Sequence, residues 1–127
     1  LGLTPQSIYN FGTYSVRAKE EKEANKLIRD SEILQKKGCF SLVLEKVPSQ
    51  LAKKVTKKIN IPTIGIGAGK HVDGQVLVIH DMLGMTQDFN PRFIRRYANL
   101  NEEISIACKN YISDVKSSNF PNKNESY

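Results

Sequence analysis

Glu45 is the residue of this sequence best suited to chemistry. It ends the short apolar run FSLVLE, directly before Val47 and Pro48, where a helix is expected to open. If that run is a strand of a parallel sheet, its carboxyl end is where active sites form. Apolar neighbours raise the pKa of a carboxyl group by desolvation, which suits a general base. The alternative is a glutamate that caps the next helix or pairs with a lysine.

A glycine-rich run, Gly65-Ile66-Gly67-Ala68-Gly69, is the second candidate site. Glycines let a backbone approach a ligand closely. The run does not match a dinucleotide-binding GxGxxG motif, because Lys70 stands where the third glycine belongs. It does not match a P-loop either, because His71 follows the lysine. A tight turn at the end of a strand is the simpler interpretation of these glycines.

His80 and Asp81 form the third candidate, which could bind a ligand or move a proton. A hydrogen-bonded structural couple is the alternative. His71 falls in a polar segment, where we expect it to be solvated. The two histidines and two cysteines are scattered, without the spacing of a metal site. Cys39 and Cys108 are expected to be small packed residues.

Alternating helix and strand patterns place these candidates at strand ends. Apolar residues at helical spacing predict a helix over Lys19–Lys37, which stops at Gly38. The next elements are a buried strand over Phe40–Glu45, a helix from Pro48 and Ser49 to near Asn60, and a strand over Pro62–Ile66. Strand, helix and strand within about 25 residues predict a βαβ crossover, so the two strands are expected to be parallel.

Further elements are predicted on either side of this crossover. A third strand is expected over Val76–Ile79, a short helix over Pro91–Tyr97, and a final helix capped by Asn101. That final helix carries an apolar stripe of Ile104, Cys108, Tyr111, Ile112 and Val115. Leu1–Val16 is expected to be a loop, and residues 117–127 a polar tail. The pattern indicates an α/β fold that is either a small open domain or about half of a (β/α)8 barrel, which needs about 250 residues.

Side-chain alternation suggests which residues would surround Glu45. If Glu45 and Ile66 point to the interior of a barrel, Val76 and Val78 are the matching positions on the next strand. A carboxylate beside three aliphatic side chains forms a small apolar pocket with a single base. Such a pocket suits a branched aliphatic substrate.

Composition excludes several classes of protein. The chain has 127 residues, the size of one domain, and no apolar stretch long enough to span a membrane. Two cysteines are too few for a disulfide scaffold, so a reducing, cytosolic setting is expected. The net charge is +6 and the pI about 9.4, which raises the question of nucleic-acid binding. However, acidic and basic residues are mixed between Arg17 and Lys37, and no aromatic residues interleave with the lysines of the one basic patch. That patch, Lys46, Lys53, Lys54, Lys57 and Lys58, is expected to be a solvent-facing helix side, with an anion-binding surface as the alternative.

The sequence closely resembles the C-terminal half of the ketopantoate hydroxymethyltransferase family. The matching stretches are LGLTPQS at residues 1–7, LVLEKVP at 42–48 and IPTIGIGAGKHVDGQVLVIHDMLG at 61–84. FPNKNESY at residues 120–127 is also similar to the family's C-terminus. The resemblance covers the whole chain in order, with family-like spacing.

This resemblance implies a fold and an activity. The family is a (β/α)8 TIM barrel, in which 40–45, 62–66 and 76–79 would be strands six, seven and eight of one domain. It transfers a hydroxymethyl group from 5,10-methylenetetrahydrofolate to α-ketoisovalerate, giving ketopantoate for pantothenate and coenzyme A synthesis. A Mg²⁺ ion chelates the keto acid and stabilises its enolate. By resemblance, Glu45 is the general base, and Ile66, Val76 and Val78 surround the isopropyl group of the substrate.

The resemblance also implies a cytoplasmic homo-oligomer, commonly a decamer, with no nucleic-acid or membrane partner. The family's metal-binding carboxylates and substrate-binding lysine belong to the first half of the barrel. We therefore expect no metal ligand among residues 1–127, and we expect this half to be inactive by itself.

Two residues depart from the family's pattern. Ala18 stands where the family usually has glycine, and Lys46 stands where a smaller residue is common. An ammonium group near Glu45 would lower the pKa of its carboxyl, so we expect the Lys46 side chain to point to solvent. A related barrel enzyme with lyase or mutase chemistry on a 2-oxo acid is the alternative function, and a basic nucleic-acid-binding module is the alternative from another class.

Overall fold

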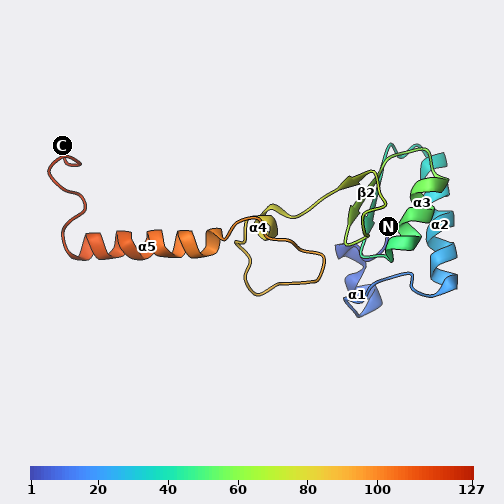
Figure 1. The fold of residues 1–127 in the computed structure, drawn as a ribbon, viewed down its shortest axis with the longest axis horizontal. Helices are drawn as coiled ribbons and strands as arrows, with labels where there is room; N and C mark the ends of the chain where they lie inside the picture. The colour runs from blue at the N-terminus through green and yellow to red at the C-terminus, as the bar shows by residue number, and fades with distance from the viewer. The chain divides into compact units, whose positions relative to one another are not determined.

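The computed structural model describes all 127 residues and divides into two compact units, Leu1–Leu77 and Val78–Tyr127 (Figure 1). The first unit contains the 3-10 helix Pro5–Ser7, α1 (Ile8–Phe11), α2 (Glu21–Lys36), β1 (Leu42–Glu45), α3 (Ser49–Lys58), β2 (Thr63–Ile66) and β3 (Gly74–Gln75). The second contains α4 (Ile79–Met82) and α5 (Leu100–Lys116).

The predicted βαβ crossover is confirmed. β1 pairs in parallel with β2, and β2 pairs in parallel with β3, in the order β1-β2-β3. The bounds of α2, β1, α3 and β2 agree with the predicted ones to within two residues, which is the usual uncertainty of element ends. The α/β class is therefore confirmed, while closure of a (β/α)8 barrel stays a prediction.

The core of the first unit lies between one face of the sheet and the helices α2 and α3. Figure 1 shows these two helices side by side on the same side of β2. Leu42 and Leu44 of β1 are buried against them, and Leu44 and Val55 are completely inaccessible to solvent. Burial of each such side chain stabilises the fold by about 1.5–3 kcal/mol. Val43, on the opposite face of β1, is 45% exposed, so the other face of the sheet is open.

Residues 1–3 form a further parallel neighbour of β1, although Leu1–Val16 was predicted to be loop. Gly2 makes a parallel bridge with Glu45, whose N–H donates to the carbonyl of Leu1 at 2.9 Å. The N–H of Leu3 donates in turn to the carbonyl of Glu45 at 2.9 Å. The prediction was wrong because the apolar run here is too short, and too rich in glycine and threonine, to resemble a strand. The same stretch also contains the 3-10 helix and α1.

The third strand was predicted in the wrong place. The structure has β3 at Gly74–Gln75, and Val76–Val78 lie outside any strand. Val76 still donates its N–H to the carbonyl of Gly65 at 3.0 Å, but pairing ends there because β2 ends at Ile66 and the chain turns at Gly67. The apolar run itself was not a sufficient signal, because a strand needs a partner along its length, and Val76, Val78 and Ile79 are exposed.

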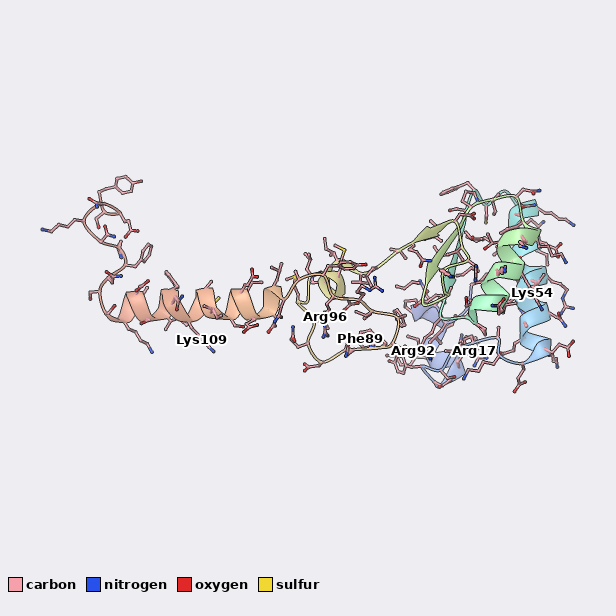
Figure 2. All side chains as sticks on the ribbon, viewed as in Figure 1. Arg17, Lys54, Phe89, Arg92, Arg96 and Lys109 are labelled. Atoms are coloured by element: carbon pink, nitrogen blue, oxygen red, sulfur yellow. The ribbon has the colours of Figure 1, made fainter.

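In the second unit, the short helix predicted over Pro91–Tyr97 is replaced by an irregular loop. The guanidinium of Arg96 donates from Nη2 to the carbonyls of Thr86 and Phe89, at 2.9 and 3.2 Å. Figure 2 labels Arg96 and Phe89 on this loop. The N–H of Tyr97 donates to the carbonyl of Met82 at 2.8 Å. These contacts to distant carbonyls replace the local hydrogen bonds that a helix would need.

The final helix is confirmed as α5, but it begins one residue after Asn99 rather than at a cap on Asn101. Its predicted apolar stripe is exposed, and no residue of α5 is buried. Cys108 is exposed, so its prediction as a packed residue was wrong, while Cys39 is half-buried. In the tail, the ring of Phe120 packs edge-on against Tyr111 with 5.5 Å between ring centres. None of the helices has the length and apolar character that crossing a membrane requires.

Candidate functional site

Glu45 lies at the carboxyl end of β1, as predicted, and its backbone is held on both sides. One side is paired with residues 1–3, and on the other side Glu45 stands opposite Ile66 of β2 in the sheet register. The residue that follows, Lys46, donates its N–H to the carbonyl of Ile66 at 2.8 Å. The backbone of Glu45 is therefore fixed between two neighbouring segments. It lies at the carboxyl ends of the strands, where parallel sheets carry their sites.

An apolar row runs beside Glu45 on the open face of the sheet. Because side chains alternate along a strand, Val43 and Glu45 share the face opposite to Leu42 and Leu44. Ile66 is directly opposite Glu45 in the register of β1 and β2. Gly65 pairs with Gln75, and the N–H of Val76 donates to the carbonyl of Gly65, so Val76 is the next residue of this row beside Ile66. The structure thus brings together three of the four predicted site residues. The fourth, Val78, belongs to the second unit, so its place beside the others stays a prediction.

The environment of Glu45 shifts its acidity in the direction that a base needs. Burial raises the pKa of its carboxyl above the ordinary value, and this is the largest effect. The amino group of Leu1 and the ammonium of Lys46 lower the pKa but do not outweigh burial. Burial therefore makes this carboxylate a stronger base than that of a solvent-exposed glutamate.

The glycine-rich run forms a turn packed against α3. Gly67 and Gly69 have left-handed φ values of 62° and 81°. A Cβ atom on Gly69 would lie 2.2 Å from Oγ of Ser49, the first residue of α3. Ala68 is completely buried in the core. The close approach that these glycines permit is therefore to the protein's own helix, which supports the tight-turn interpretation.

His80 and Asp81 lie in the short helix α4 rather than at the end of a strand. The imidazole of His80 is exposed, and Asp81 is 8% exposed. No hydrogen bond or ion pair joins the two side chains, so neither a proton relay nor a structural couple is formed. The prediction that they follow a third strand was wrong because that strand ends at Gln75.

The loop over residues 12–18 contacts the site and was missed by the sequence reasoning. The N–H of Arg17 donates to the carbonyl of Lys46 at 3.0 Å, and Nζ of Lys46 donates to the carbonyl of Tyr14. The Lys46 side chain is therefore held by this loop instead of extending freely into solvent. Ala18 has φ 55°, the left-handed conformation that favours glycine, so this loop keeps a backbone shape that glycine suits better. A left-handed residue has no signature in a sequence that lacks the glycine.

A cavity of about 380 Å³ lies between residues 1–18 and α2. Its walls carry polar and charged side chains, among them Thr4, Ser7, Arg17 and Glu23. Glu45 does not line it, so the cavity is separate from the open face that carries the candidate base.

The described residues do not form a metal site. No group of three or more His, Cys, Asp or Glu side chains lies close enough together to hold a metal ion.

Comparison with known proteins gives the family. The sequence profile described as ketopantoate hydroxymethyltransferase matches residues 1–123. The chain is 68% identical over 127 residues to the 3-methyl-2-oxobutanoate hydroxymethyltransferase of Flavobacterium johnsoniae, and 66% identical to that of Christiangramia forsetii. All of this chain is aligned in both cases, with 47% of each relative, so the chain spans about half the length of the curated relatives it matches. The chain belongs to the ketopantoate hydroxymethyltransferase family.

Proposed function

We propose that these residues serve as the C-terminal half of a 3-methyl-2-oxobutanoate hydroxymethyltransferase in the cytoplasm. The reaction moves a hydroxymethyl group from 5,10-methylenetetrahydrofolate to α-ketoisovalerate and gives ketopantoate, a step of pantothenate synthesis. The family match over residues 1–123 supports the reaction, and the position of Glu45 supports the mechanism. The half-buried Cys39 and exposed Cys108, both free thiols, are compatible with a reducing compartment.

In the proposed mechanism, the carboxylate of Glu45 removes the proton from C3 of α-ketoisovalerate, the carbon next to the carbonyl. The resulting enolate forms a carbon–carbon bond to the methylene carbon of 5,10-methylenetetrahydrofolate, and the two bonds from that carbon to folate nitrogens break. Water supplies the hydroxyl oxygen, and tetrahydrofolate leaves with the C3 proton and one proton from the water. Ile66, Val76 and Val78 contact the two methyl groups of the substrate and keep water away from the carboxylate. This exclusion of water is consistent with the observation that burial is the main cause of the raised pKa of Glu45.

We further propose Mg²⁺ as the cofactor, with all of its ligands outside residues 1–127. The support is the family resemblance alone, because no metal-binding group is formed here. We also propose a homo-oligomer, with the decamer as the expected form. The exposed apolar residues of α5 offer a surface for such an assembly.

A chimera tests the proposed reaction directly. In it, this chain replaces the aligned 47% of the Flavobacterium johnsoniae relative, so that both halves of the length are present. We expect ketopantoate to form from α-ketoisovalerate only when methylenetetrahydrofolate and Mg²⁺ are supplied. Conversion of α-ketoisovalerate to a different product without the folate would instead support the related enzyme with lyase or mutase chemistry. An inactive, folded chimera would contradict the proposed function.

A further inference from the structure

The peptide that joins Glu45 to Lys46 is held from three directions. Residues 1–3 pair with the backbone of Glu45, and Ile66 accepts the N–H of Lys46 at 2.8 Å. The carbonyl of Lys46 accepts the N–H of Arg17 at 3.0 Å. Two of these supports belong to the sheet, and the third is the loop 12–18, which has no sheet partner of its own.

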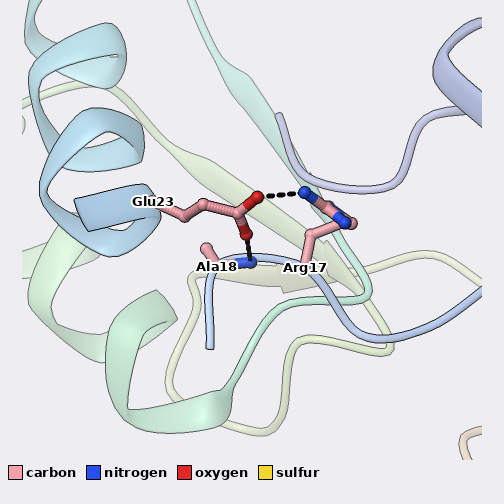
Figure 3. Close-up of polar contacts among 3 residues, drawn as sticks. All are labelled: Arg17, Ala18 and Glu23. Carbon is pink, nitrogen blue, oxygen red and sulfur yellow. Dashed lines mark hydrogen bonds and ion pairs between the residues drawn. The ribbon is translucent and has the colours of Figure 1, made fainter. Parts of the chain in front are cut away.

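This loop is fastened to α2 by one carboxylate. Oε1 of Glu23 pairs with Nη2 of Arg17, and Oε2 accepts the backbone N–H of Ala18 at 2.8 Å (Figure 3). The guanidinium of Arg17 also lies over the ring of Phe11, 3.9 Å from its centre. Glu23 thus binds two successive residues of the loop, while Arg17 joins the loop to α1.

The same loop also holds the side chain of Lys46. Nζ of Lys46 donates to the carbonyl of Tyr14, which lies in the loop 12–18 before the two residues that Glu23 binds. The backbone of Lys46 has a left-handed φ of 51°, and that of Ala18 one of 55°. Non-glycine residues keep such conformations only where surrounding contacts enforce them. The contacts that do so here are those between Lys46 and the loop, and those between the loop and Glu23.

We propose that Arg17 and Glu23 are positioning residues, whose ion pair fixes the loop 12–18 on Lys46 and thereby holds the carboxylate of Glu45 in place for proton abstraction. This inference rests on the proposed function, because it concerns the same carboxylate. Neither residue hydrogen-bonds to Glu45, so each would act on that carboxylate through Lys46.

Release of the loop would change both the geometry and the charge around Glu45. The Lys46 backbone would lose its bond to Arg17, so the carboxylate one residue earlier would be less well oriented. The ammonium of Lys46 would lose the carbonyl of Tyr14, and the nearby negative charge of Glu45 would attract it. Closer approach of that ammonium would lower the pKa of the Glu45 carboxyl further.

The charged groups that act on Glu45 are Lys46 and the amino group of Leu1. In the chimera, residue 1 follows a peptide bond, so its nitrogen carries no charge and Lys46 remains. Groups supplied by the other half are the same in every variant and cancel in the comparison.

The test measures exchange of the C3 proton of α-ketoisovalerate with deuterium in the chimera, as kcat and KM over a range of pH. Arg17→Met keeps the apolar stem of the side chain and removes the charge. Glu23→Gln keeps an oxygen for the N–H of Ala18 and weakens the pair with Arg17. The matched control is Lys26→Met, which removes the ion pair with Asp30 on the same helix but has no bond to the loop.

We expect Arg17→Met and Glu23→Gln each to lower kcat by about 5-fold or more, with KM changed by less than about 2-fold, since orientation rather than binding is lost. The acid limb of the pH profile should move to lower pH. In a Lys46→Met background, which lacks the ammonium, that movement should disappear. Arg17→Lys, which keeps a charge for Glu23, should recover part of kcat, and Lys26→Met should behave as the unmodified chimera.

Three results would overturn the inference. The first is an unchanged kcat and pH profile in both Arg17→Met and Glu23→Gln. The second is a loss of activity that is fully explained by a smaller folded fraction, as measured by thermal unfolding. The third is the same pH shift in the Lys46→Met background. A chimera with unmodified Arg17 and Glu23 that exchanges no C3 proton would instead contradict the proposed function, and with it this inference.

Discussion

At Glu45, burial and charge act on the same carboxyl group in opposite directions. Burial raises its pKa, whereas the amino group of Leu1 and the ammonium of Lys46 lower it. The hydrogen bond from Lys46 to Tyr14 limits the second effect, because it occupies the ammonium with a neutral carbonyl. The residue type and its place after an apolar run were sufficient to single out Glu45 from the sequence. The restraint on Lys46 was not predictable, since it depends on a loop more than 30 residues earlier in the chain.

Asp73 provides a second prediction at the scale of single residues. Its carboxylate accepts hydrogen bonds from the N–H and Oγ1 of Thr63, at 2.8 and 2.9 Å, and these bonds lower its pKa below the ordinary value of an aspartic acid. A carboxyl group with a depressed pKa in the folded state stabilises the protein above the unfolded pKa. This stabilisation is lost as the pH falls through the folded value.

We therefore expect the unfolding midpoint of the chimera to fall as the pH is lowered below about 4, the unfolded pKa of an aspartic acid, and to fall less steeply in Asp73→Asn. The measurement is chemical or thermal unfolding at a series of pH values. Asp88→Asn is the control, because Asp88 is exposed and makes no hydrogen bond in the structure. An identical pH dependence for Asp73→Asn and the unmodified chimera would show that these bonds to Thr63 contribute nothing.

Among the elements, the contact between the glycine-rich turn and α3 determines how the end of β2 is placed. Gly69→Ala would put a Cβ atom 2.5 Å from Cβ of Ser49, at a φ of 81°. We expect this change to lower the free energy of unfolding by about 2–4 kcal/mol, from left-handed strain and overpacking together. Denaturant unfolding of the chimera measures the effect.

Two further variants separate strain from overpacking. Gly38→Ala introduces the same left-handed strain, at φ 92°, where no atom lies within 4 Å, so it should cost only about 1–2 kcal/mol. Ser49→Gly combined with Gly69→Ala should recover the overpacking part. Equal costs for Gly38→Ala and Gly69→Ala would refute the contact with α3.

The sequence was a good guide to elements whose signals are local. Helical spacing and a glycine stop were enough for α2, and a proline followed by apolar residues at helical spacing was enough for α3. β1 and β2 were found because each lies in a short, mostly apolar run that glycine or proline bounds. β3 was misplaced, and residues 1–3 were missed, because short strands are specified by their partners rather than by their own residues. The loop at Pro91–Tyr97 was likewise decided by the distant contacts of Arg96.

At the scale of the whole molecule, large apolar side chains remain exposed in both units. Val43 is 45% exposed on the open sheet face, and Ile104 and Ile112 of α5 are 47% and 49% exposed. Exposed apolar surface of this kind promotes association in water. We expect the 127-residue chain by itself to bind a hydrophobic dye and to show a mass that rises with concentration in sedimentation. A monomer without dye binding would contradict this view of the open face.

The proposed activity follows from the sequence only through its family motifs. Composition and charge excluded a membrane span and made nucleic-acid binding a weak hypothesis, but nothing in them specifies a one-carbon transfer. The metal, the folate and the assembly stay predictions, because they rest on the family resemblance and nothing in the structure of residues 1–127 tests them.

The most direct test of the account is deuterium exchange at C3 of α-ketoisovalerate in the Glu45→Gln chimera, followed by NMR. Glutamine keeps the size and polarity of the side chain and removes the base. We predict that the exchange rate falls by at least about 100-fold, while the unfolding midpoint stays close to that of the unmodified chimera. Exchange at the unmodified rate in a folded Glu45→Gln protein would show that Glu45 is not the base.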